Sequence, residues 1–258
     1  MLLTILKFLI SYFILAFYFN FIPILFPMND IIYLLHFLLF FPLAYMVSRI
    51  LTKSGLETYG IVFFQGWKKN LSMGFLFGFS AWTILFLLYF ILEKYEFTGI
   101  NLSSNTPMII LAILVGFGLG SFISDMIVRG LVFYYFNELP VVYVMIIAIA
   151  VYALDDIWYA GLSFQNTVFS CALGLSLTYV FYKTNSIWAS AGIHFGLNVV
   201  YGLFFGVSGK AGEGILLFES SQAPPTITYW LSTMVSILLF ISVYKYRFLF
   251  LSKRNDRG

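Results

Sequence analysis

The stretch SDMIVRG, residues 124–130, lies inside an otherwise apolar run of about thirty residues. It places the carboxylate of Asp125 four residues before the guanidinium of Arg129, in the middle of a segment suited to cross a membrane. An ionisable side chain at the centre of a membrane helix costs at least ~2.5–3.5 kcal/mol on insertion scales, so it needs a partner or a function. Two later stretches also place polar or ionisable side chains in apolar runs: VYALDDIW, residues 151–158, and ASAGIHFGLN, residues 189–198.

The composition of the chain is that of a membrane protein. Of 258 residues, 61% are hydrophobic and 10% are charged, whereas soluble domains carry about 25% charged residues. The apolar runs reach twenty residues, the length that an α-helix needs to cross roughly 30 Å of hydrocarbon. We therefore expect an all-α, polytopic membrane protein, and the single cysteine, Cys171, can form no intramolecular disulfide.

The apolar runs predict a bundle of about eight transmembrane helices. The first run has no basic segment before it and no small-residue cleavage site, so we expect it to be retained as a span and not removed as a signal peptide. The predicted spans are residues 3–25, 31–50, 71–93, 108–136, 140–160, 165–182, 186–206 and 227–250.

The basic residues predict how the bundle is oriented. An even number of spans puts both termini on one side, and assigning that side to the cytoplasm leaves only Lys94 and Lys210 outside, in agreement with the positive-inside rule. The net charge of +3 then reflects the basic residues on the cytoplasmic side and does not indicate a nucleic-acid partner. The partner we expect is the lipid bilayer. The cations placed inside are Arg49, Lys53, Lys68, Lys69, Lys183, Lys245, Arg247, Lys253, Arg254 and Arg257, with Lys7 close by.

The predicted spans divide the chain into three regions. Residues 1–106 hold the N-terminal helices, residues 107–206 hold the polar stretches, and residues 207–258 hold an outer loop, the last helix and a basic tail. Within the first region, residues 51–69 combine apolar side chains with Trp67 and two lysines, which fits a helix in the headgroup layer and fits an ordinary loop equally well. We expect the outer loop at 207–226, rich in Gly, Pro and Ser, to be irregular.

Three predicted helices each carry a polar pair at a spacing of four residues, which places both members on one helix face. Such faces would be costly against lipid, so we expect them to meet around one shared cavity. The pairs are Asp125 with Arg129, Tyr152 with Asp156, and His194 with Asn198.

Each polar residue also has a purely structural interpretation. Asp125 and Arg129 could simply lock their helix against its neighbours as a buried ion pair. Asp155 and Asp156 could lie near the outer end of their span with one or both in water, and we expect this for Asp155. A lone membrane histidine such as His194 more often forms a hydrogen bond between helices than binds a metal, and His36 has no acidic neighbour in the sequence, so we expect it only to pack.

Taken in order, these stretches resemble the CAAX-protease and bacteriocin-processing (CPBP, or Abi) family of intramembrane metalloproteases. The family pattern is E-E-x-x-x-R-G, then F-x-x-x-H, then H-x-x-x-N or H-x-x-x-D. Here SDMIVRG aligns with the first motif, YALDD with the second, and SIWASAGIHFGLN with the third, which is the closest match. The resemblance covers about residues 107–206, and it implies an integral protein of the bacterial cell membrane.

The chain departs from the family pattern most sharply at two positions. Ser124 stands where the family has the glutamate expected to activate water, and Asp156 stands where it has a histidine. The second glutamate is shortened to Asp125, and Tyr152 replaces the phenylalanine. If activity survives, the resemblance implies that Asp156 and His194 hold zinc or another divalent metal and that Asp125 acts as base. Arg129 would then position the acidic helix face, and Asn198 would steady the metal or the oxyanion.

Three functions remain open from the sequence. The first is a divergent intramembrane metallo-endopeptidase of the CAAX-type or bacteriocin-processing and immunity class, acting on a membrane-proximal peptide. The second is a pseudoenzyme that keeps the fold, needs no cofactor, and binds a peptide or a membrane protein. The third is a small transporter in which Asp125, Asp155 and Asp156 carry protons or cations, although the sequence shows no duplicated halves.

Overall fold

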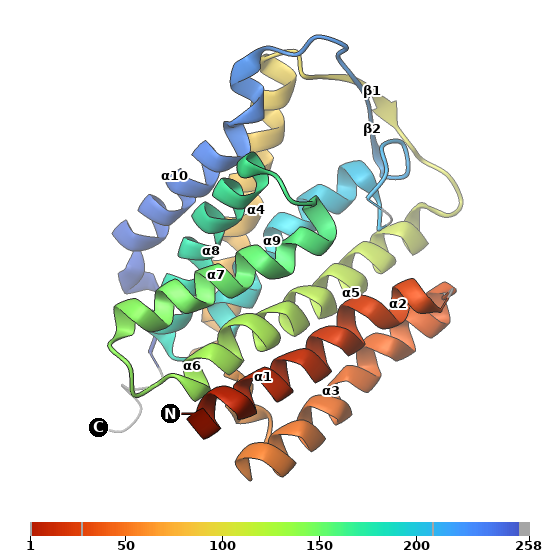
Figure 1. Cartoon of the computed structure of the whole chain (residues 1–258). Coiled ribbons are helices and arrows are strands. Elements are labelled where there is room, and N and C mark those ends of the chain that lie inside the picture. Colours follow the sequence, from red (N-terminus) through yellow and green to blue (C-terminus); the bar gives the residue numbers. More distant parts are fainter. Residues whose placement is uncertain (1, 27, 208, 253–258) are drawn as a thin grey trace.

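The structure is a computed structural model that describes residues 2–26, 28–207 and 209–252 of the chain. It is an all-α polytopic membrane protein, as predicted, and its helical segments match the eight predicted spans within a few residues. Five of these segments are long and apolar enough to cross a membrane by themselves. The start of α1 and the end of α10 lie toward the same end of the bundle (Figure 1), as an even number of spans requires.

The first two spans form a pair along one side of the bundle. The first consists of α1 (Leu2–Ala16), a π-helical turn η1 (Phe17–Phe21) and the short α2 (Ile22–Leu25). The second, α3 (Asp30–Thr52), begins where the Asn29 side chain accepts a hydrogen bond from the backbone N–H of Ile32 at 3.0 Å. A side chain that caps a free N–H in this way stabilises the first turn of a helix.

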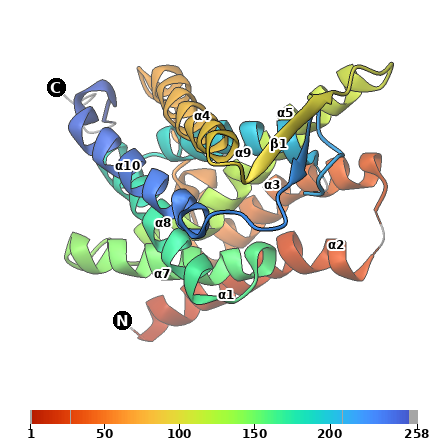
Figure 2. The same ribbon diagram turned by 90° about the horizontal axis from the view of Figure 1, so that it is seen from above.

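The fourth span runs through the middle of the protein. Its parts are α5 (Thr106–Asp125), the π-helical turn η3 (Met126–Gly130) and α6 (Leu131–Tyr135). Helix α5 contacts α3 on one side and α9 (Trp188–Phe205) on another, so it separates the α1–α3 pair from the remaining helices (Figures 1 and 2). The segment that contains SDMIVRG is therefore surrounded by protein.

The remaining helices form the second part of the bundle. They are α4 (Trp67–Ile91), α7 (Val141–Ala160), α8 (Phe164–Thr184) and α10 (Leu231–Lys245), the last preceded by a 3₁₀ turn, η4 (Thr226–Tyr229). Helix α8 contacts α7, α9 and α10 and buries Ser170, Ser176, Thr178 and Thr184. Small polar side chains let membrane helices approach closely, which explains why α8 is less apolar than a helix facing lipid.

Helices α4 and α9 approach each other through glycine. Gly74 and Gly78 on α4 face Gly192 and Gly196 on α9, and a Cβ added at any of the four would overlap backbone atoms of the opposite helix. This arrangement of small residues four positions apart is typical of tight membrane helix pairs. The contact fixes the rotation of α9, which carries His194 and Asn198.

The outer loops contain a strand pair that was not predicted. Strand β1 (Tyr95–Ile100) pairs antiparallel with β2 (Leu216–Ser220), with Tyr95 opposite Ser220 and Ile100 opposite Leu216. The expectation of an irregular loop at 207–226 was therefore wrong for residues 216–220. The two segments are far apart in sequence, and their pairing is stabilised by the Tyr95 and Phe218 rings, whose centroids lie 4.5 Å apart.

Residues 53–66 form a loop and not an interfacial α-helix. They contain only a short 3₁₀ turn, η2 (Leu56–Tyr59), and Trp67 already begins α4. The loop is fixed to the bundle because the buried Tyr59 hydroxyl donates to Ala44 O at 2.8 Å and the Ile187 N–H donates to Gly60 O at 3.0 Å. Of the two readings of this segment, the loop is the one that the structure supports.

The α4–α9 contact leads to a first prediction. Replacing Gly78 by alanine should destabilise the protein by roughly 1–3 kcal/mol, because the added methyl group forces the two helix backbones apart. The measurement is unfolding of the purified protein in detergent. Gly120→Ala in α5 is the matched control, since a Cβ there would meet no atom within 4 Å. Equal stability of the two variants would contradict the role given to this contact.

Candidate functional site

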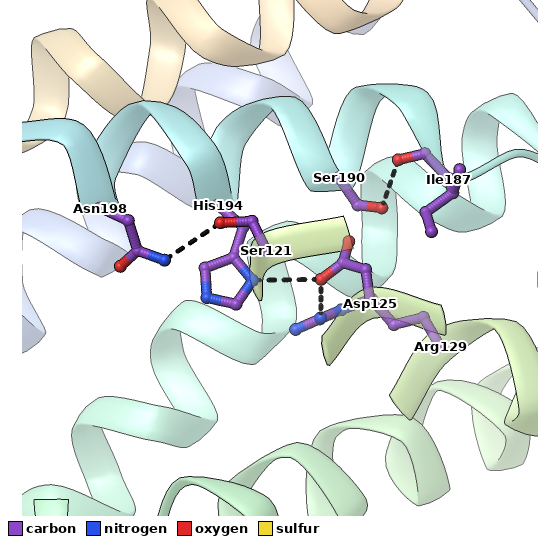
Figure 3. A network of polar contacts seen from close by, with 7 residues as sticks. All are labelled: Ser121, Asp125, Arg129, Ile187, Ser190, His194 and Asn198. Atoms are coloured by element: carbon purple, nitrogen blue, oxygen red, sulfur yellow. Dashed lines mark hydrogen bonds and ion pairs between the residues drawn. The ribbon is translucent and has the colours of Figure 1, made fainter. Parts of the chain in front are cut away.

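A ladder of polar side chains joins α5 to α9. The Asn198 amide donates to Ser121 Oγ at 3.1 Å, and His194 Nδ1 lies 3.3 Å from Asp125 Oδ1 (Figure 3). The two helices run antiparallel, so a step of four residues forward on α5 corresponds to a step of four residues back on α9. A second such step brings Arg129 toward the level of Ser190. Four of the predicted site residues are thereby brought together: Asp125, Arg129, His194 and Asn198.

Asp125 and Arg129 form the predicted ion pair, and both side chains are completely buried. Asp125 Oδ1 accepts from Arg129 Nη1 and also faces His194. On its other side, the Arg129 guanidinium carbon lies 4.6 Å from the centre of the Tyr152 ring, a cation–π contact. The same Tyr152 ring meets the His194 ring edge-on at 6.2 Å. The ion pair therefore connects three helical segments: α5 with η3, α7 and α9.

Arg129 lies in the π-helical turn η3, which is fully buried. The next residue, Gly130, contacts the Tyr59 backbone, and a Cβ at Gly130 would overlap it. Glycine is therefore required for the 53–66 loop to reach this depth. Single π-helical turns occur often at functional sites, and here the turn lies immediately beside the only ion pair between an arginine or lysine and a carboxylate in the described residues.

Two donors of Arg129 have no hydrogen-bond partner. Its Nε and Nη2 atoms are buried and unpaired within the part of the chain that the structure describes. A buried donor left unpaired costs about 1–3 kcal/mol, and more for a charged group. Asp125 therefore neutralises the Arg129 charge without satisfying all of its hydrogen-bond donors.

The two aspartates of α7 lie apart from this ladder. Asp156 accepts a hydrogen bond from the Ser170 hydroxyl of α8. Asp155 is 3% exposed and accepts from the Asn20 amide at 3.1 Å. The expectation of a solvated Asp155 was wrong, because the first span bends through η1 and places Asn20 against α7.

The donor set does not fit a three-ligand metal site. A catalytic zinc takes three protein ligands and keeps one position for water, but no three His, Cys, Asp or Glu side chains of the described residues form such a group. Asp125, the expected base, is already bound to Arg129 and faces His194. Ser124 is buried and offers a neutral hydroxyl. The assignment of a metal to Asp156 and His194 stays a prediction.

Sequence reasoning missed the partners of the predicted residues. Ser121 lies four residues before Asp125, so the stripe of polar residues on α5 could have been extended to it from the spacing alone. Asn20 and Ser170 carried no such signal, because each pairs with an aspartate on another helix. His36 is buried with its ring stacked on Tyr18 at 4.4 Å, as expected for a packing histidine.

The ion pair generates a second prediction. Asp125→Ala should destabilise the protein by about 3–5 kcal/mol, because it leaves the Arg129 charge buried without its counter-ion. The double variant Asp125→Ala/Arg129→Ala should be more stable than the single variant, since an absent pair costs less than a lone buried charge. Unfolding in detergent measures both. Equal stability of the single and the double variant would show that the pair is not structural.

One protein-family model matches the part of the chain that contains the ladder. A family model described as "Rce1-like: Type II CAAX prenyl endopeptidase Rce1-like" matches residues 106–200. A search of curated proteins found no match to the chain. The matched range contains every predicted site residue, from Asp125 to Asn198. The resemblance to the CPBP family is therefore confirmed, and it is carried by residues 106–200, a region similar to the Rce1-like CAAX prenyl endopeptidases.

Proposed function

We propose that the protein is a non-catalytic member of this intramembrane protease group that holds a peptide segment at the polar ladder between α5 and α9. The observation that carries the proposal is the position of Asp125. Its carboxylate is completely buried, is paired with Arg129 and faces His194. A general base must reach the water whose proton it accepts, and a carboxylate in this position does not.

The chemistry of the neighbouring residues supports the same conclusion. The hydroxyl of Ser124 has no basicity comparable to the glutamate of the family pattern. Asp156 accepts a hydrogen bond from Ser170 on α8, while His194 faces Asp125 on α5. The two groups proposed to hold a metal therefore have separate partners, and a metal would have to displace both.

The ladder nevertheless offers groups that can bind a peptide. The His194 side chain is 12% exposed and Asn198 is partly exposed, so this edge of the ladder is accessible. An extended peptide inside a bilayer must satisfy its backbone N–H and C=O groups within protein. The Asn198 amide can exchange its bond to Ser121 for a bond to a peptide carbonyl.

A metallo-endopeptidase is the second candidate, and the match to residues 106–200 favours it. In that function Asp156 and His194 would hold the metal, and Asp125 would act as base after release from His194. Arg129 would orient Asp125, and Asn198 would bind the substrate oxygen. The metal would supply a polarised water molecule. The edge-on contact of the His194 ring with Tyr152, one turn before Asp156 on α7, supports this assignment.

The two positions that leave the family pattern provide the test. Wild type should bind zinc weakly and should not cleave a prenylated CAAX peptide in detergent. Ser124→Glu/Asp156→His should raise zinc affinity, because imidazole is a good zinc ligand, and either change alone should do less, because base and metal act together. Zinc is measured by metal analysis of the purified protein, and cleavage by mass spectrometry of the peptide.

Binding without cleavage needs its own readout. Wild type should retain the intact prenylated peptide, and Asn198→Ala should weaken retention while Asn101→Ala, in an outer loop away from the ladder, should not. Should wild type instead hold one divalent metal per chain and cleave the peptide, with Asp156→Ala abolishing both, then Asp156 is a ligand and the endopeptidase function replaces the one proposed.

A further inference from the structure

A cavity of about 550 Å³ lies at the end of the bundle where α8 and α10 finish, and no residue of the polar ladder lines it. It is formed by the last turns of α8 and by a 3₁₀ turn, η5 (Arg247–Leu249), that follows α10. Its lining includes Tyr179, Tyr182, Lys183, Arg247, Phe248 and Phe250. This is the end that the positive-inside rule assigns to the cytoplasm.

The cavity carries two positive charges and no negative one. Lys183 and Arg247 both line it, and none of its lining residues is acidic. Neither cation forms an ion pair with a carboxylate in residues 2–26, 28–207 and 209–252. A pair of unneutralised cations in one concave site attracts an anion more strongly than isolated surface charges do.

Arg247 is held in place before any ligand arrives. Its guanidinium carbon lies 4.7 Å from the centre of the Tyr244 ring, and its Nη1 donates to Tyr244 O at 3.0 Å. A guanidinium has five N–H donors, so several remain for a ligand. Arginine presents these donors as a planar fork that matches phosphate oxygens, and a nearby lysine adds a mobile point charge.

The rim of the cavity has the character of a membrane interface. Phe248, in the turn after α10, is 70% exposed, and Tyr182, in the last turn of α8, is 38% exposed. Tyrosine and tryptophan side chains gather at this level in membrane proteins, and basic pockets between helices on the cytoplasmic side bind anionic lipid headgroups. The apolar rings can contact acyl chains while the two cations contact the headgroup.

We infer that this cavity binds the phosphate of an anionic phospholipid headgroup. Lys183 and Arg247 contact the phosphate oxygens, and Tyr182 and Phe248 contact the upper part of the acyl chains. The lipid thereby adds a contact at the end of the α8–α10 interface, where the Tyr179 ring of α8 already lies 5.5 Å from the Tyr244 ring of α10. This inference is independent of whether the polar ladder binds a peptide.

Native mass spectrometry of the full chain tests the inference. Wild type released from nanodiscs of phosphatidylglycerol and phosphatidylcholine should retain phosphatidylglycerol in preference to phosphatidylcholine. Lys183→Gln/Arg247→Gln should weaken this retention roughly 30-fold, the effect of removing two cations at a membrane surface. Equal retention of both lipids by wild type would overturn the inference.

Arg49 and Lys69 provide a matched control. Arg49 also lies over a tyrosine ring, at 5.5 Å from that of Tyr45, and also donates to a backbone carbonyl, that of Lys53 at 3.2 Å. Both residues are exposed, both are predicted to be cytoplasmic, and neither lines the cavity. Arg49→Gln/Lys69→Gln therefore removes the same charge and should leave lipid retention unchanged.

Two further outcomes would overturn the assignment. Equal loss of phosphatidylglycerol in the two double variants would show that any pair of cytoplasmic cations attracts the lipid and that the cavity is not a specific site. Displacement of the lipid by low concentrations of inorganic phosphate or glycerol phosphate would assign the cavity to a soluble phosphate compound instead. Thermal unfolding of each variant in detergent checks that the substitutions leave the fold intact, and Lys183→Arg should keep wild-type retention.

Discussion

The buried charge of Arg129 is the constraint on which the centre of this protein depends. A guanidinium away from water must be neutralised and hydrogen-bonded, and here one carboxylate oxygen and one aromatic face surround it. Asp125 supplies the first from the preceding turn, and Tyr152 supplies the second from α7. Because His194 on α9 faces the same carboxylate oxygen, the position of Arg129 also determines how three helical segments meet. The polar ladder follows from this requirement.

The opposite face of α9 explains why the ladder is in register. Gly192 and Gly196 each lie two residues from His194, which places them roughly 200° around the helix from it. They are in contact with α4, where any Cβ would overlap backbone. Close packing on that side fixes the rotation of α9, and the face with His194 and Asn198 must then point toward α5. The tight contact and the polar ladder are two consequences of one helix orientation.

The sequence predicted the spans, the ion pair and the meeting of the polar faces of α5 and α9, because hydropathy and a spacing of four residues act within one helix. It did not predict the pairing of β1 with β2, the burial of Asp155 or the bond between Asp156 and Ser170. Each of these depends on a partner distant in the chain, such as Asn20 for Asp155. The π-helical turns at η1 and η3 also left no signal in composition, yet both rotate a polar side chain into the bundle.

The same carboxylate would have to serve both stability and catalysis. As the counter-ion of Arg129, Asp125 must remain ionised, buried and close to the guanidinium. As a general base it would have to face a water molecule and accept a proton, which would remove the negative charge that Arg129 needs. A glutamate at position 124, roughly 100° around the helix, could act as the base while Asp125 remained the counter-ion of Arg129. With Ser124 in that place, the chain keeps the residue that stabilises the fold and lacks the residue that could act on water, which is the reason that binding without cleavage is the function we propose.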